Sequence, residues 1–280
     1  MVKFKSMLNF FVKKSFCSNL IVVFAFFSFG CSTSDDSNND DSSNFVLTIT
    51  ASNTIEVDTV FDVTISTSEL MQSLEVSLDN FQTSITHVDH LGDNTLRYFS
   101  FNNLGNQTIY FKAKNNAGIE VVDTVTVNVV RGDAIKIESI TLNSFFNMGS
   151  TWDDEFPTSN LNHLADVAFG LLKPPIDMLT GNRSATPSTS WLWYTATTHN
   201  NESSLNWNLQ NDDLYINANE LNVFIGFFDD DGEFAQDLML GPPFERAIPI
   251  DNYIDSQPIS ITVNEPDINL NFTVGIDWLQ

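Results

Sequence analysis

The chain has 280 residues and carries 36 Asp and Glu against 12 Lys and Arg, for a formal net charge of −24. Such an acidic surface repels phosphate backbones and anionic lipid headgroups, so the composition excludes a nucleic-acid-binding protein. The same surface attracts cations. The length suffices for one large or two ordinary domains.

The first 30 residues have the order of a secretory signal peptide: basic residues, then an apolar run, then small residues. The apolar run, Leu20–Phe29, ends in Gly30 and Cys31, and four lysines precede it: Lys3, Lys5, Lys13 and Lys14. The run spans about ten residues, too few for a membrane helix, which needs ~20. We therefore predict a signal peptide over residues 1–30. Its removal takes away four basic residues and no acidic ones, which leaves the mature chain more acidic still.

The Gly30-Cys31 pair at the end of this run resembles the lipobox of bacterial lipoproteins. That resemblance implies that cleavage leaves Cys31 as an acylated N-terminus. The Ser-, Asp- and Asn-rich segment 31–44 resembles the acidic export signal of Bacteroidetes lipoproteins. It implies a lipid anchor in the outer membrane, with the protein facing the cell exterior. The alternative is an ordinary secretory signal in which Cys31 is incidental.

Cysteine usage agrees with this address. The other cysteine, Cys17, lies inside the predicted signal peptide, so the mature chain would keep only Cys31. We therefore expect neither a disulfide nor thiol catalysis. Segment 31–44 is so polar that it has almost nothing to bury, and we expect a disordered tether there.

Residues 45–130 form a series of short apolar segments with the period of two that is typical of half-buried strands. With no helical period in this stretch, the pattern predicts a β-sandwich. Asn115–Gly118 separates the last two segments as a hairpin turn. The predicted strands are Phe45–Ala51, Ile55–Val57, Phe61–Ser66, Leu74–Leu78, Thr95–Phe101, Thr108–Lys114 and Val121–Val130.

The segment Thr108–Gly118, followed by Thr124–Val127, resembles the last hairpin of bacterial Ig-like and PKD-type repeats. The resemblance implies an Ig-like domain over residues 45–130 that serves as a spacer or a recognition module. Arg131-Gly132-Asp133 follows as the junction to the next domain. An adhesion function of this tripeptide is the weaker interpretation.

Residues 134–280 begin a second series of strands without a helical stripe, and we predict a second β-sandwich. The last strand alternates most clearly, because every second residue from Ile268 to Trp278 is apolar. The whole fold is therefore expected to be all-β, with two consecutive antiparallel sandwiches. The predicted strands are Ile135–Asn143, Ala165–Leu172, Trp191–Thr198, Leu205–Leu209, Leu214–Ile216, Leu221–Phe228, Ala247–Ile250, Ile259–Val263 and Ile268–Trp278.

Three aspartates follow the apolar strand Leu221–Phe228 with the spacing D-x-D-x5-D: Asp229, Asp231 and Asp237. This arrangement resembles the third calcium loop of C2 domains, in which a hydrophobic strand leads into the same spacing. Clustered loop carboxylates supply the oxygen ligands that Ca²⁺ requires. The resemblance implies a C2-like fold for residues 134–280 and a calcium site that contains these three residues.

A second part of the same site is then expected near the start of this domain. In C2 domains the first calcium loop follows the first strand, and its last aspartate leads into the second strand. Here Asp153 and Asp154 follow the first strand, and Asp166 precedes the second. The resemblance therefore adds Asp166, together with Asp153 or Asp154, to the calcium ligands. The alternative is a pair of solvated acidic loops.

Two other groups of residues suggest weaker hypotheses. Trp191 and Trp193 lie on the same side of a predicted strand, where they could stack against sugars or belong to the core. His87 and His90 could pair on a metal, but no Cys or third His is near in sequence, which favours ordinary surface histidines.

Three classes of function remain. The first is a non-catalytic surface lipoprotein whose Ig-like module presents a C2-like, calcium-binding domain to an extracellular protein or glycan. The second is a glycan-binding lipoprotein of an outer-membrane polysaccharide-uptake system, which depends on Trp191 and Trp193. The third is a hydrolase that uses paired carboxylates. The chain lacks the G-x-S-x-G, H-E-x-x-H, P-loop and Rossmann motifs, so we predict that it is not an enzyme.

Overall fold

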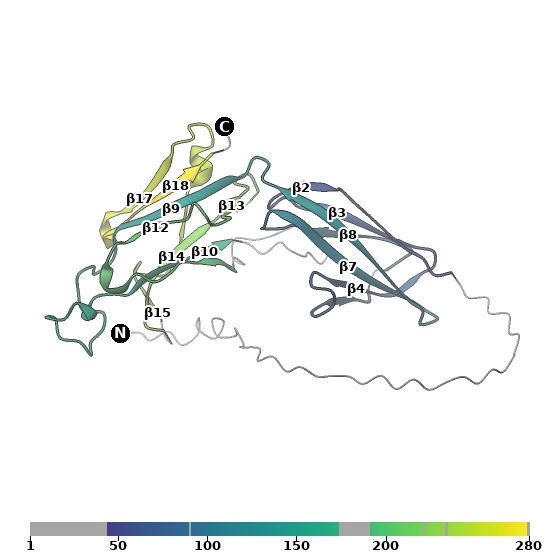
Figure 1. Ribbon diagram of the computed structural model, residues 1–280, viewed down its shortest axis with the longest axis horizontal. Coiled ribbons are helices and arrows are strands. Elements are labelled where there is room, and N and C mark those ends of the chain that lie inside the picture. Colours follow the sequence, from purple (N-terminus) through teal and green to yellow (C-terminus); the bar gives the residue numbers. More distant parts are fainter. Residues whose placement is uncertain (1–43, 90, 174–190, 221, 233–234, 279–280) are drawn as a thin grey trace, which may run out of the picture. The chain divides into compact units, whose positions relative to one another are not determined.

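The computed structural model describes residues 44–89, 91–173, 191–220, 222–232 and 235–278, and it is built from strands (Figure 1). The predicted signal peptide, Cys31 and almost all of the predicted tether lie outside the described residues. Helices in the described part are short 3-10 turns. None of them has the length and apolar character needed to cross a membrane.

The first sandwich contains eight strands: β1 (Leu47–Ala51), β2 (Thr54–Glu56), β3 (Phe61–Thr67), β4 (Met71–Ser77), β5 (Ile85–His87), β6 (Asn94–Phe99), β7 (Gly105–Asn115) and β8 (Glu120–Val130). One sheet has the order β1-β3-β6 and the other the order β2-β8-β7-β4-β5. β2 runs parallel to β8, and the other pairs are antiparallel. Ig-like domains divide their strands between two sheets in this way.

Alternating apolar residues build the core of this sandwich. Val63 and Ile65 of β3 are fully buried, whereas Thr64 between them is not. Phe99 of β6 meets Phe111 of β7 edge-on, with 6.1 Å between the ring centroids. This contact joins the two sheets across the core, and the edge-on geometry suits the aromatic quadrupoles.

The junction between the two series of strands is anchored by Arg131. Its Nε donates to the carbonyl of Ala134 over 2.8 Å, and its two terminal nitrogens donate to the carboxylate and carbonyl of Asp277, each over 2.9 Å. None of the four sheets combines described strands from both sides of residues 131–134. The guanidinium is therefore engaged within the fold and is not displayed for adhesion.

The second sandwich contains ten strands: β9 (Ile135–Ser144), β10 (Val167–Lys173), β11 (Trp191–Thr195), β12 (Asn206–Asn208), β13 (Tyr215–Ile216), β14 (Phe224–Asp230), β15 (Ala235–Asp237), β16 (Arg246–Ala247), β17 (Ser260–Glu265) and β18 (Leu270–Asp277). One sheet has the order β12-β9-β18-β17, with β13 also on β9. The other has the order β11-β10-β14-β15, with β16 also on β14. All of these pairs are antiparallel.

The alternation predicted for the last strand is present in the structure. Leu270, Phe272 and Val274 of β18 are fully buried, and the residues between them face outward. The ring of Phe272 lies 5.3 Å from that of Phe227 on β14, in the opposite sheet. The core of the second sandwich therefore lies between these two sheets (Figure 1).

The predicted all-β fold made of β-sandwiches is confirmed. Every predicted strand overlaps an observed one, but β5 and β15 were not predicted. Both have only three residues and include exposed positions, so neither leaves a clear alternation in the sequence.

The core assignment predicts that a substitution on the buried face of β18 lowers the unfolding free energy far more than one on the exposed face of its neighbour β17. Phe272→Ala should cost about 3–5 kcal/mol of unfolding free energy because it leaves a cavity in the core. Thr262→Ala, on the exposed face of β17, should stay within about 0.5 kcal/mol of the wild type. All five tryptophans follow residue 134, so denaturant unfolding monitored by tryptophan fluorescence reports on this sandwich. Equal losses in the two variants would contradict the assignment.

Candidate metal centre

Asp229 owes its burial to the alternation of β14. Ile225 and Phe227 point into the core on this strand, and Asp229 occupies the next inward position, where its exposed fraction is 0%. One of its carboxylate oxygens, Oδ1, accepts a 2.7 Å hydrogen bond from the backbone N–H of Asp166. The other, Oδ2, is buried and has no hydrogen-bond partner among the described residues. A buried polar atom of this kind is costly unless a further partner is present.

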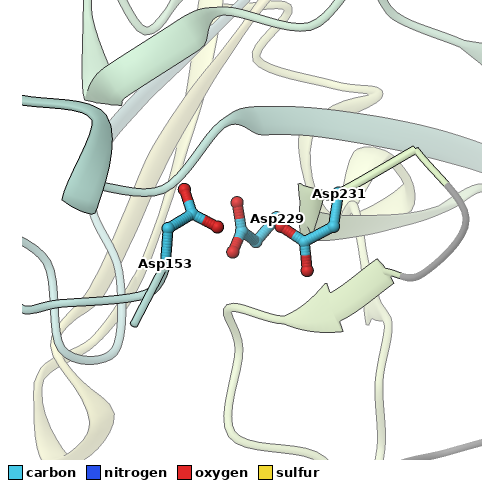
Figure 2. Close-up of side chains that lie close together, drawn as sticks. All are labelled: Asp153, Asp229 and Asp231. Carbon is cyan, nitrogen blue, oxygen red and sulfur yellow. The ribbon is translucent and has the colours of Figure 1, made fainter. Parts of the chain in front are cut away.

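Two more carboxylates point toward Asp229 (Figure 2). Asp153 lies in the connection between β9 and β10, and Asp231 lies between β14 and β15. One carboxylate oxygen from each of Asp153, Asp229 and Asp231 lies within 4.8 Å of the corresponding oxygens of the others. We call these three residues the acidic cluster. Asp153 is half-buried and Asp231 is exposed, so the cluster runs from the core to the surface.

The position of Asp153 is set by its own connection. The backbone N–H groups of Trp152 and Asp153 both donate to the carbonyl of His163, over 2.8 and 3.3 Å. The indole of Trp152 packs on Phe145, with 6.2 Å between the ring centroids, and its Nε1 donates to the carbonyl of Asn147. These contacts fold the connection back toward the start of β10.

A third connection, between β11 and β12, reaches the same end of the sandwich. The backbone N–H of Asn201 donates to the carboxylate of Asp166 over 2.8 Å, and the N–H of Glu202 donates to the carbonyl of Ala165. Asn201 and Glu202 both have left-handed backbone angles, with φ of 59° and 55°. The sequence patterns did not predict a role for this connection. The Asn200-Asn201 pair was the available signal for left-handed backbone angles, because Asn tolerates them better than most residues with a side chain.

The electrostatics of the cluster oppose ionisation of Asp229 and Asp153. Burial raises the pKa of Asp229 to about 7; the bond from the Asp166 N–H opposes this, and the charges of Asp231, Asp153 and Asp166 add to it. Burial also raises the pKa of Asp153 to about 6, with further contributions from Asp231, Glu155 and Asp166. None of the neighbours that shift these two pKa values is a cation. At neutral pH, ionisation of these two carboxyl groups is therefore unfavourable unless a proton or a cation offsets the negative charge.

The structure brings together only part of the predicted ligand set. Asp153, Asp229 and Asp231 form the cluster, and Asp166 borders it through the contacts described above. Asp154 is exposed and does not join the cluster. Asp237 does not join it either, because its carboxylate accepts from the backbone N–H groups of Met239 and Gly241, over 3.0 and 2.5 Å. Asp237 thus closes the turn after β15.

The predicted sugar platform is described only in part. Trp193 is half-buried, and the Nζ of Lys173 lies 3.9 Å from the centroid of its ring. A sugar could stack only on a ring face that the ammonium leaves open. The side chain of Trp191 and the whole of His90 lie outside the described residues.

No protein-family model matches this chain, and no curated protein matches it. Among solved structures, the chain is similar to the PKD domain of an M14-like peptidase from a Thermoplasmatales archaeon. That similarity has 13% identity and a TM-score of 0.26, and it covers 30% of this chain and 92% of the other.

The raised pKa values predict how the stability of the metal-free protein depends on pH. A carboxyl whose pKa rises from 3.8 in the unfolded chain to about 7 in the folded one binds its proton more tightly when folded. Its contribution to stability is therefore complete below pH ~4 and is lost as the pH rises to ~7. In chelator, the melting temperature of the wild type relative to Asp229→Asn should fall between pH 5 and pH 8. A constant difference would contradict the assigned pKa.

Proposed function

We propose that this protein is a non-catalytic lipoprotein of the cell surface, in which the Ig-like sandwich presents a calcium-binding second sandwich to an extracellular partner. The observation that carries the calcium assignment is the acidic cluster, with its three carboxylate oxygens within 4.8 Å of one another. The proposed localisation is inferred from the signal-like N-terminus and Cys31, and the proposed binding site is inferred from the geometry of the cluster.

The chemistry of the cluster suits calcium better than other common metals. All three side chains offer carboxylate oxygens, which hard cations prefer, and no group of potential metal ligands among the described residues contains His or Cys. Ca²⁺ accepts six to eight oxygens in flexible geometry. The buried Oδ2 of Asp229, which has no partner among the described residues, is the atom that most needs a cation.

A second buried aspartate, Asp58, has its counter-charge within the protein. Asp58 is also 0% exposed, and it accepts a 2.8 Å hydrogen bond from the Nζ of Lys173, which is itself buried. Its other oxygen accepts from the backbone N–H of Asn217. The carboxylate of Asp58 is thus neutralised by a protein cation. Asp229 instead faces two further carboxylates, so we infer that its counter-charge comes from solution.

The arrangement of connections supports a C2-like second sandwich. The sequence resemblance implies that the first and third calcium loops meet at one end of the domain. Here the β9–β10 and β14–β15 connections supply Asp153 and Asp231, which face each other across Asp229 (Figure 2). β10 also pairs with β14, with Val167 opposite Asp229, so Asp166 adjoins the same end.

A C2-like fold does not bring phospholipid binding with it. Anionic-lipid recognition uses basic patches, and this chain has only 12 Lys and Arg, four of them in the predicted signal peptide. Membrane attachment would come from the acylated Cys31. The partner of the calcium-loaded end is therefore expected to be an extracellular protein or glycan.

Calcium should stabilise the folded protein, because the cluster exists only in the folded state. The expected gain is about 2.7 kcal/mol at a hundredfold excess over Kd, with Kd on the order of 10⁻⁴–10⁻³ M as in other extracellular modules. Mg²⁺ should substitute poorly, since it demands a strict octahedron and retains water. The measurement is the melting temperature in chelator and in calcium or magnesium titrated from about 1 to about 100 mM, a range that reaches the hundredfold excess.

Two variants with the same charge change make this test specific. Asp229→Asn with Asp231→Asn should abolish the calcium-induced rise, and it should raise the melting temperature in chelator by relieving repulsion. Asp251→Asn with Asp255→Asn, at exposed positions outside the cluster, should leave the rise intact. If the wild type melts at the same temperature with and without calcium, the proposed site is refuted.

The proposed localisation at the cell surface can be tested independently of calcium binding. Cys31→Ala should release the protein from membranes, since the acyl chains on Cys31 are its proposed anchor. Changing Asp35, Asp36, Asp40 and Asp41 to Ser should leave the protein anchored but protected from protease added to whole cells. Unchanged protease sensitivity of that variant would remove the export signal from the proposal.

A further inference from the structure

The outer face of the sheet β12-β9-β18-β17 differs in composition from the rest of this acidic chain. Charged residues stand at one end of this face, at Lys136, Glu138 and Asp277, and the other outward positions carry hydroxyls, carboxamides and one glycine. We call this uncharged stretch the neutral face, and its residues are Ser139, Thr141, Asn143, Asn206, Asn208, Ser260, Thr262, Asn264, Asn271, Thr273 and Gly275. Solvated sheet faces of soluble proteins usually carry charges of both signs throughout, so an uncharged stretch of this extent is unusual here.

One end of the neutral face is held in order by its own hydrogen bonds. The carboxamide of Asn143 donates to Asn271 over 2.6 Å, and that of Asn271 donates to Asn264 over 2.9 Å. The hydroxyls of Thr262 and Thr273 lie 3.1 Å apart. Side chains fixed in advance in this way lose less entropy when a ligand binds.

The other end of the neutral face forms a groove of about 570 Å³. Four carboxamides line it, those of Asn206, Asn208, Gln210 and Gln257, and all four residues are exposed. Asn206 and Asn208 use only their oxygens in the hydrogen bonds of the fold, accepting from the Thr141 hydroxyl and the Gln210 N–H respectively. Within the described residues, the four amide NH₂ groups have no protein acceptor. They are available to a ligand.

Gly275 keeps the groove open in the middle of the sheet. A Cβ at this position would lie 2.3 Å from the Oγ of Ser139, so any side chain here would displace the neighbouring strand's hydroxyl. Ile259, which also lines the groove, is 85% exposed and supplies an apolar contact. Of the two acids in the lining, Glu138 and Asp277, the second is paired with Arg131.

We propose that this groove binds a neutral polysaccharide. Carboxamides both donate and accept, as sugar hydroxyls do, so the two can pair without leaving either side unsatisfied. An exposed apolar side chain beside them suits the C–H face of a pyranose ring. The strongly acidic chain repels anionic polymers, and the lining of the groove contains two acids and no Lys or Arg to compensate.

This binding surface is separate from the calcium site. The acidic cluster lies in the connections around the sheet of β10 and β14, whereas the groove lies on the outer face of the opposite sheet. It is also separate from Trp193, which lies on β11 in the sheet of β10. The proposed glycan site is therefore the groove on the neutral face, and not the strand that carries Trp191 and Trp193.

Affinity electrophoresis of the protein in gels that contain xylan, galactomannan, mixed-linkage β-glucan or alginate tests the proposal. At least one neutral polysaccharide should retard the wild type, and alginate should not. Asn206→Ala with Asn208→Ala should raise Kd about tenfold, the value of one or two lost hydrogen bonds. Gln210→Ala with Gln257→Ala should act likewise, and these side chains have no described hydrogen-bond partner whose loss would disturb the fold.

Three controls separate the groove from other sites. Asn103→Ala with Asn106→Ala makes the same change at exposed positions of the first sandwich and should leave retardation unchanged. Chelator and Asp229→Asn should also leave it unchanged, so a failure of the calcium proposal would not affect this one. Absence of retardation by all three neutral polysaccharides would overturn the inference. Retardation that persists in both groove variants but disappears in Trp193→Ala would overturn it too.

Discussion

The carboxylate of Asp229 imposes a constraint on the whole end of the second sandwich. It occupies an inward position of β14, is 0% exposed, and keeps one oxygen without a partner among the described residues. The other oxygen ties β14 to the start of β10 through the Asp166 N–H. Moving a carboxylate out of water is expensive unless charge and hydrogen bonds compensate. A fold that keeps this group buried, with Asp153 and Asp231 beside it, gains stability from any cation that neutralises the three.

This constraint links the proposed calcium site to three connections between strands. Asp153 reaches the cluster because His163 holds the β9–β10 connection by two hydrogen bonds. The β11–β12 connection adopts left-handed angles at Asn201 and bonds to the carboxylate of Asp166. A cation between the carboxylates would remove the repulsion that opposes this convergence. We therefore expect calcium to order this end of the second sandwich without altering its two sheets.

The sequence was informative where alternation and spacing act together. The period of two in β18 predicted its buried face. The spacing of Asp229 and Asp231 after a hydrophobic strand predicted two members of the cluster. It was less informative for Asp237, because an aspartate can ligate a metal or accept from nearby N–H groups, and spacing does not distinguish these uses. The groove on the neutral face left no motif, since its carboxamides come from separate strands and turns that only the sheet order brings together.

The proposed calcium site and the groove on the neutral face would give the proposed surface lipoprotein two independent binding sites, but the account depends most on the buried carboxylate of Asp229. A crystal structure of the protein grown in millimolar calcium tests it most directly. Electron density for an ion should lie between Asp153, Asp229 and Asp231, with oxygen ligands at about 2.3–2.6 Å that include the Oδ2 of Asp229. The account would be contradicted by an ordered water, or by carboxyl groups hydrogen-bonded to one another, at that position in the presence of calcium.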